Sequence, residues 1–162
     1  FLLLEKMRKK LAKIIATSFG FGYVPVAPGT FGALFALGIS CLMIYLGMNP
    51  QEIFLIHTIL IFLGYTLGVW ATSVLENEWG HDPSKIVMDE SIGTWITYLF
   101  ITPNYYHYIL GFILFRIFDI WKPIGVKYFD NKKTASSVML DDVIAGIYAA
   151  IVLFLILKFF PF

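Results

Sequence analysis

The sequence predicts an all-α membrane protein, a polytopic helix bundle with about five apolar segments and an N-terminal amphipathic helix. Three observations lead to this prediction. Hydrophobic residues make up 59% of the chain and charged residues only 14%. The mean hydropathy is +0.78, which lies outside the usual range of soluble domains. Several apolar stretches also approach the roughly 20 residues that one bilayer crossing requires. We therefore expect residues 1–162 to form a single membrane domain.

The first 20 residues have the pattern of a basic amphipathic helix. Leucine, isoleucine and methionine alternate there with the basic residues Lys6, Arg8, Lys9, Lys10 and Lys13. Such a helix lies on an anionic membrane surface, and an excess of Lys and Arg marks the cytoplasmic side. A solvated run of charge is the alternative. Because the net charge of the whole chain is only +1, a nucleic-acid partner gains no support.

The apolar segments follow in order after a breaker-rich loop. That loop ends at Thr30, which we expect to be a helix N-cap. The five expected segments are residues 31–48, 53–75, 86–101, 105–121 and 138–160. The third and fourth segments are short, so a hairpin that enters the membrane only partway is an alternative to two crossings.

The charged residues are expected to meet at one membrane face. With a cytoplasmic N-terminus, five crossings would return every charge-bearing segment end to the same side. These ends are Thr30, residues 81–90, residues 116–122 and the pair Asp141 and Asp142. The topology therefore predicts one polar site at the cytoplasmic face of the bundle.

Four carboxylates at these ends predict a metal site. Asp89, Glu90, Asp141 and Asp142 lie within or beside apolar segments, where an ionised side chain costs about 3 kcal/mol on insertion scales. Four such groups cannot all ionise in a low-dielectric site without cations. Ligation by oxygen alone suits Mg²⁺, which often bridges to a substrate phosphate. Mg²⁺ is therefore the expected cofactor.

The end of the fourth segment predicts a phosphate clamp. Arg116 and Asp119 share a helix face, and Lys122 follows one step further along. Arginine offers a bidentate fork to phosphate oxygens and lysine a point charge, while Asp119 could be a further metal ligand. In the alternative, Arg116 and Asp119 only hold the bundle together and Lys122 only anchors it at the interface. Thr30 could add a helix N-terminus that binds a phosphate oxygen, or it could be a plain cap.

The loop before the third segment contains a candidate proton donor. His81, followed by Asp82, could protonate a leaving alkoxide or order a water. A loop histidine can equally be a surface residue. A rival interpretation of all these charges is an ion or proton transporter, since intramembrane acids also mark transport paths. A transporter predicts charges spread through the membrane depth or broken helices in inverted repeats, and neither pattern is present in the sequence.

Four sequence blocks resemble, in order, the signature blocks of the phosphatidylglycerophosphatase A family. They are Pro25-Val-Ala-Pro-Gly-Thr30, His81-Asp-Pro-Ser-Lys-Ile-Val-Met-Asp-Glu90, Phe115-Arg-Ile-Phe-Asp-Ile-Trp-Lys-Pro123 and Met139-Leu-Asp-Asp-Val-Ile-Ala-Gly146. The resemblance implies a multihelical enzyme at the inner face of a bacterial membrane. Its implied reaction is the Mg²⁺-dependent hydrolysis of phosphatidylglycerophosphate to phosphatidylglycerol and inorganic phosphate.

The resemblance also implies roles for the charged residues. Asp89, Glu90, Asp141 and Asp142 would be metal ligands or water-activating carboxylates, and Asp119 could complete the metal shell. Arg116 and Lys122 would clamp the phosphate. His81 and Asp82 could transfer protons.

Overall fold

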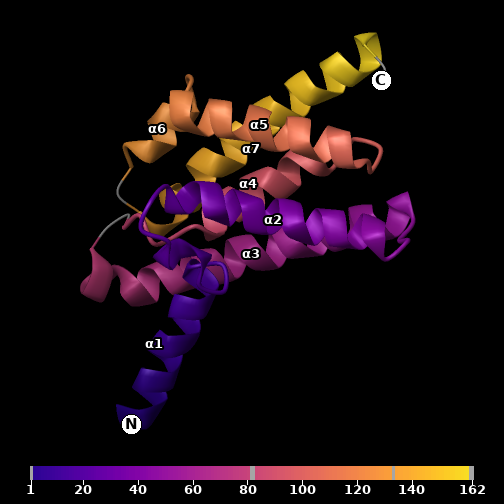
Figure 1. Cartoon of the computed structure of the whole chain (residues 1–162). Helices are drawn as coiled ribbons and strands as arrows, with labels where there is room; N and C mark the ends of the chain where they lie inside the picture. The colour runs from indigo at the N-terminus through magenta and orange to yellow at the C-terminus, as the bar shows by residue number, and fades with distance from the viewer. Residues whose placement is uncertain (1, 81–82, 133, 161–162) are drawn as a thin grey trace.

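Every regular element of the described chain is a helix, which confirms the predicted all-α class. The structure, a computed structural model, describes residues 2–80, 83–132 and 134–160. Figure 1 shows the elements in chain order. They are α1 (Leu2–Ala16), η1 (Phe21–Tyr23), α2 (Pro28–Tyr45), α3 (Pro50–Trp79), α4 (Met88–Tyr98), α5 (Tyr105–Trp121), α6 (Val126–Asp130) and α7 (Ala135–Phe159).

Local capping interactions define where the two longest helices begin. The Asn49 side chain accepts a hydrogen bond from the Glu52 N–H at 3.0 Å, and the Glu52 carboxylate accepts one from the Asn49 N–H at 2.9 Å. This capping box, with Pro50 at the first helical position, begins α3. Thr134 and Ser137 form the corresponding box at the start of α7. Both boxes satisfy backbone N–H groups that the helix itself leaves without partners.

The helix α2 begins three residues earlier than the sequence suggested. Ala27 is its N-cap, with φ 49°, and Pro28 occupies the first turn. The prediction that Thr30 caps this helix is therefore wrong, because Thr30 is the third helical residue. Proline favours the first helical position, since its fixed φ suits a helix and its missing N–H would have no helical partner there.

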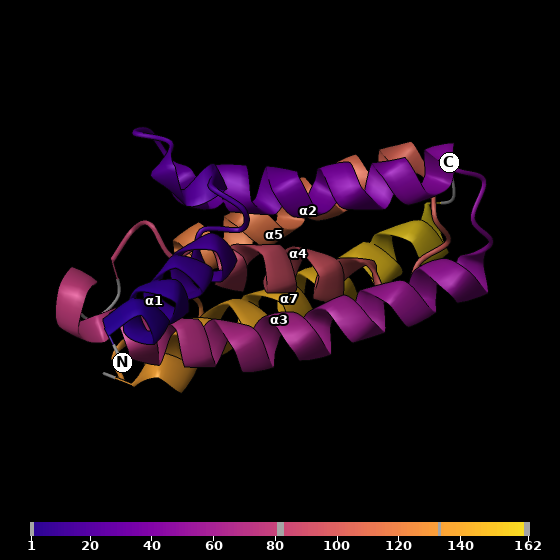
Figure 2. The same cartoon turned by 90° about the horizontal axis from the view of Figure 1, so that it is seen from below.

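Three helices are long and apolar enough to cross a membrane within the described part of the chain: α2, α3 and α7. The five crossings expected from sequence are not confirmed. The 11 residues of α4 rise only about 16 Å, roughly half of a 30 Å hydrocarbon core. Figures 1 and 2 place α4 between α2, α3, α5 and α7, and all its residues except Glu90 are buried. The helix α4 is thus an internal helix of the bundle.

The segment ends that carry charged residues meet at one end of the bundle. The start of α2, the end of α3, the end of α5 and the start of α7 all lie on the left side of Figure 1. We call this the polar end. The helix α1 joins the bundle there and runs across the direction of α2 and α3. Its Ala12 and Ala16 pack in a buried cluster with Ala71 and Leu75 of α3, whereas Leu2, Leu3, Leu4, Met7 and Leu11 are exposed.

Candidate active site

A polar network fixes the first turn of α4, which carries two of the predicted site residues. The Val87 N–H donates to the Ala16 carbonyl at 2.8 Å, which ties the residue before α4 to the end of α1. The buried Ser91 hydroxyl donates to the Gly32 carbonyl of α2 at 2.9 Å and lies 2.9 Å from the Ser18 hydroxyl. Because these hydrogen bonds are buried, the turn is held in one position.

Two glycines of α2 let this turn of α4 approach closely. A Cβ atom at Gly29 would collide with the Glu90 carboxylate and lie 3.4 Å from an Arg116 guanidinium nitrogen. A Cβ at Gly32 would lie 2.5 Å from the Val87 carbonyl oxygen. Residues three apart share a helix face, so both glycines face α4. Sequence reasoning missed Gly29 and Gly32, although their spacing of three residues was a visible signal.

A second close contact brings α4 and α7 together one turn below the acidic residues. A Cβ atom at Gly146 would lie 3.0 Å from the backbone carbon of Gly93. A Cβ at Gly93 would lie 2.7 Å from the Asp142 carbonyl oxygen. Gly93 follows Asp89 by four residues, and Gly146 follows Asp142 by four. The glycine contact therefore determines how closely the carboxylates of the two helices approach.

Three carboxylates form a compact cluster at the polar end. Asp89, Glu90 and Asp142 each place one oxygen within 4.8 Å of the others, and we call them the carboxylate cluster. Asp89 Oδ1 and Glu90 Oε2 are buried and have no hydrogen-bond partner among the described residues. Buried like charges repel strongly at such distances. Closely spaced oxygen donors that lack partners fit a divalent cation such as Mg²⁺.

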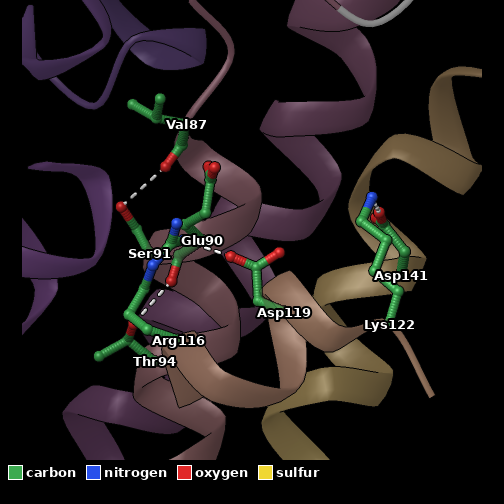
Figure 3. Close-up of polar contacts among 8 residues, drawn as sticks. All are labelled: Val87, Glu90, Ser91, Thr94, Arg116, Asp119, Lys122 and Asp141. Atoms are coloured by element: carbon green, nitrogen blue, oxygen red, sulfur yellow. Dashed lines mark hydrogen bonds and ion pairs between the residues drawn. The ribbon is translucent and has the colours of Figure 1, made fainter. Parts of the chain in front are cut away.

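The other two predicted acidic ligands lie beside the cluster, each in an ion pair. Arg116 pairs with Asp119 within α5, and both side chains are largely buried. Lys122 Nζ lies 3.5 Å from Asp141 Oδ2 and so links the end of α5 to α7. Figure 3 shows the Arg116–Asp119 pair next to Glu90 and the Lys122–Asp141 pair further away, beyond Asp119. Asp119 and Asp141 still interact electrostatically with members of the cluster.

The remaining predicted site residues have different outcomes. Thr30 lines a groove together with Arg116, so it lies near the predicted phosphate clamp even though it does not cap α2. His81 and Asp82 lie outside the described residues.

Fold and site together define a class of protein: an all-α membrane protein with a buried carboxylate cluster, flanked by an arginine and a lysine, at one end of its bundle. Such a site combines the ligands for a cation with the groups that bind an anion. The sequence profile of a family described as phosphatidylglycerophosphatase A matches residues 14–157. The chain belongs to this family.

Curated relatives support the assignment over most of the chain. A Bacteroides thetaiotaomicron protein named "Putative phosphatidylinositol-3-phosphatase" is 42% identical over 146 residues, covering 88% of this chain and 91% of the relative. The phosphatidylglycerophosphatase A of Escherichia coli K12 is 35% identical and covers 96% of this chain and 91% of its own length. That of Haemophilus influenzae is 41% identical, with 88% and 86% covered. No solved structure matches the chain significantly.

Proposed function

We propose that this protein is a Mg²⁺-dependent lipid phosphatase that converts phosphatidylglycerophosphate to phosphatidylglycerol and inorganic phosphate. As a family member, the chain is a phosphoric monoester hydrolase. The observation that carries the proposal is the carboxylate cluster beside Arg116 and Lys122, within the region that the family profile matches. This arrangement supplies the charge neutralisation and positioning that phosphoryl transfer requires.

The residues that would hold Mg²⁺ are Asp89, Glu90 and Asp142, with Asp119 completing the shell. Their fit rests on the short distances between the three carboxylates and on the buried oxygens without partners. When bound, Mg²⁺ would neutralise the carboxylate charge, polarise the phosphate and increase the acidity of a bound water.

The other site residues would bind the phosphate and move a proton. Arg116 offers two parallel N–H donors to phosphate oxygens, and its pair with Asp119 holds the guanidinium in place. Lys122 adds a positive charge at the end of α5, and the Thr30 hydroxyl would donate to the same phosphate. Asp141 lies beside the cluster in an ion pair with Lys122, and we assign it the role of the base that accepts a proton from the attacking water. His81 and Asp82 stay predicted to protonate the leaving alkoxide.

We place the site at the cytoplasmic face of a bacterial inner membrane. The basic helix α1 joins the bundle at the polar end, and an excess of Lys and Arg marks the cytoplasmic side of membrane proteins. The relative from Escherichia coli and the three apolar helices support an inner-membrane location. The lipid headgroup would then reach the site while its acyl chains stay in the bilayer.

The names of the relatives indicate two candidate substrates, both of them lipids with a phosphomonoester headgroup. Two relatives are named phosphatidylglycerophosphatase A, and one bears the name of a phosphatidylinositol-3-phosphatase. Both names describe removal of a phosphomonoester from a lipid headgroup. We favour phosphatidylglycerophosphate because the family profile agrees with it. The transporter alternative is not supported, since the family is one of phosphatases and the site carboxylates lie together at one end of the bundle.

The test is phosphate release by the purified protein in detergent. Phosphatidylglycerophosphate and phosphatidylinositol 3-phosphate would be compared with Mg²⁺, with EDTA, and with Mg²⁺ restored after EDTA. We expect faster release from phosphatidylglycerophosphate, loss of release with EDTA and recovery on Mg²⁺ addition. Faster release from phosphatidylinositol 3-phosphate would show that this lipid, and not phosphatidylglycerophosphate, is the preferred substrate. Absence of metal-dependent release from either lipid by folded protein would overturn the proposed function.

A further inference from the structure

We propose that a groove along α5, beside the start of α2, holds one acyl chain of the phosphorylated lipid while its phosphate lies at Arg116. The inference rests on the proposed function, because its occupant is a lipid with a phosphomonoester headgroup. The groove has a volume of about 640 Å³. Among the described residues that line it, two are polar, Thr30 and Arg116, and five are apolar residues of α5.

The apolar wall is open to the outer side of the bundle, where we infer that lipid hydrocarbon would lie. Its residues Phe112, Ile113, Ile117, Ile120 and Trp121 recur on successive turns of α5 and so follow one helix face. Ile113 and Ile117 are 47% and 50% exposed, so the groove is open on its outer side. Ten residues of α5 span about 14 Å. Because α5 packs against α2 and runs along it (Figures 1 and 2), the groove follows the direction that lipid chains would have.

Arg116 joins the groove to the carboxylate cluster. Its guanidinium pairs with Asp119 and lies next to Gly29, the position where the Glu90 carboxylate packs against α2. Its Nε is buried and has no hydrogen-bond partner among the described residues. A buried donor without a partner is costly, and an anionic headgroup would satisfy it. A cation in the wall of an apolar groove therefore matches a lipid with an anionic phosphate better than a neutral apolar molecule.

Two other apolar grooves lack this combination. One lies around Phe154 of α7 and Ile96 of α4, and the other around Phe35 of α2 and Trp95 of α4. No charged side chain lines either groove in the part of the chain that the structure describes. The α5 groove combines an apolar wall with a cation that lies beside the carboxylate cluster. We therefore favour it as the route by which the substrate enters the site laterally from the bilayer.

Photo-cross-linking tests the groove without requiring catalysis. The full protein in lipid nanodiscs would receive phosphatidic acid with a diazirine in its acyl chain, or phosphatidylcholine with the same chain, and labelled residues would be mapped by mass spectrometry. We expect the phosphatidic acid to label residues 112–121 several-fold more than the exposed α3 residues Leu55 and Leu63. The phosphatidylcholine should show no such preference. Equal labelling of both helices by phosphatidic acid would overturn the proposal.

A substitution in the groove tests the same proposal by enzyme kinetics. Ile117→Trp fills the groove, whereas Ile109→Trp places the same bulk at an equally exposed α5 position that does not line it. With long-chain phosphatidylglycerophosphate, we expect Ile117→Trp to lower kcat/KM about ten-fold and Ile109→Trp to leave it unchanged. With the deacylated, water-soluble headgroup, both variants should match the wild type.

Equal losses of kcat/KM on both substrates, or no loss on the long-chain lipid, would contradict the proposed groove. A wild type that releases no phosphate would instead refute the proposed function, and the cross-linking result would still decide the groove.

Discussion

At the scale of single residues, the carboxylate cluster is the feature that most needs a partner. Asp89 and Asp142 are buried and Glu90 is half-buried, and their oxygens lie within 4.8 Å of one another. A protein rarely keeps three such groups together without compensation, because desolvation and mutual repulsion both disfavour their charged forms. A bound cation would supply that compensation.

The substitution Asp142→Asn should therefore separate stability from metal binding. Removing one like charge relieves repulsion, so we expect the metal-free variant to have a higher Tm than the metal-free wild type. Mg²⁺ should raise the Tm of the wild type by mass action and leave the Tm of the variant nearly unchanged. Thermal unfolding in detergent, with and without Mg²⁺, measures both effects. An equal Mg²⁺ response in the two proteins would show that the ion binds elsewhere.

Gly29 is the residue that lets Glu90 and Arg116 share the start of α2. A Cβ atom there would collide with the end of the Glu90 side chain, which can rotate away. We therefore expect Gly29→Ala to fold but to displace the carboxylate and reduce kcat at least ten-fold. Gly38→Ala is the matched control, because it lies in the same helix and its Cβ would meet no atom within 4 Å. That control should keep full activity and gain roughly 0.5–1 kcal/mol of stability. Full activity in Gly29→Ala would argue against a role for Glu90 at this position.

At the scale of elements, the contact between α4 and α7 assembles the site. Gly93 and Gly146 let the two backbones meet one turn below the cluster, and the Thr97 hydroxyl donates to the Gly146 carbonyl at 3.3 Å. Neither helix alone brings the three carboxylates together. The cluster exists because two small residues permit the helices to approach.

A methyl group at Gly146 tests this assembly. The atoms that it would meet belong to the backbone of Gly93 and cannot rotate away, so Gly146→Ala should push α4 and α7 apart. We expect a loss of about 1–3 kcal/mol in the free energy of unfolding, as overpacking typically costs. Mg²⁺ affinity should fall as well. Denaturant unfolding and Mg²⁺ titration of activity measure the two effects. A variant with wild-type stability and wild-type Mg²⁺ dependence would contradict the role of this contact.

The sequence predicted the all-α class, but the five membrane crossings expected from it are not confirmed. Hydropathy reports the length of an apolar run, and residues 86–101 form such a run. Only 88–98 are helical there, and the surrounding helices bury them. A short internal helix and a membrane span have the same composition, so the distinction depends on neighbours that a single segment does not reveal. The start of α2 was missed because the proline signal at Pro28 competed with the capping signal of Thr30.

At the scale of the whole molecule, α1 and the polar end together determine how the protein would sit in a membrane. The helix α1 exposes Leu3, Met7 and Leu11 and is held to α3 by the ion pair of Lys13 with Glu78. A helix with an exposed apolar face that runs across the bundle direction suits the membrane interface. The polar end would then lie at the depth of the lipid headgroups.

Cysteine labelling tests the sidedness of this arrangement. The single cysteine, Cys41, is first replaced by alanine. In this background, Lys127→Cys marks the polar end, and Leu46→Cys marks the opposite end, between α2 and α3. Both positions are exposed. We expect a membrane-impermeant maleimide to label Leu46→Cys in intact bacterial cells, and Lys127→Cys only after the membrane is opened. The reverse pattern would place the site on the other face.

The sequence predicted that these charged residues lie at one end of the bundle, but not how they pair with one another. The i,i+3 spacing of Arg116 and Asp119 made their pairing foreseeable within one helix. The division of the acidic residues was not foreseeable. Asp142 joins Asp89 and Glu90, whereas its neighbour Asp141 pairs with Lys122. Adjacent helical residues point in directions about 100° apart, and which of them faces α4 depends on the helix contact that the glycines permit.

The most direct test of the central claim is phosphate release from phosphatidylglycerophosphate by three proteins: the wild type, Asp89→Asn and Glu52→Gln. Glu52 lies at the start of α3, at the end of the bundle opposite the site, and glutamine preserves its capping role. The carboxylate cluster predicts Mg²⁺-dependent release by the wild type and Glu52→Gln, and a loss of roughly 10²–10³ in kcat for Asp89→Asn. Release by Asp89→Asn at the wild-type rate, or release that persists in EDTA, would contradict a metal-dependent active site at the cluster.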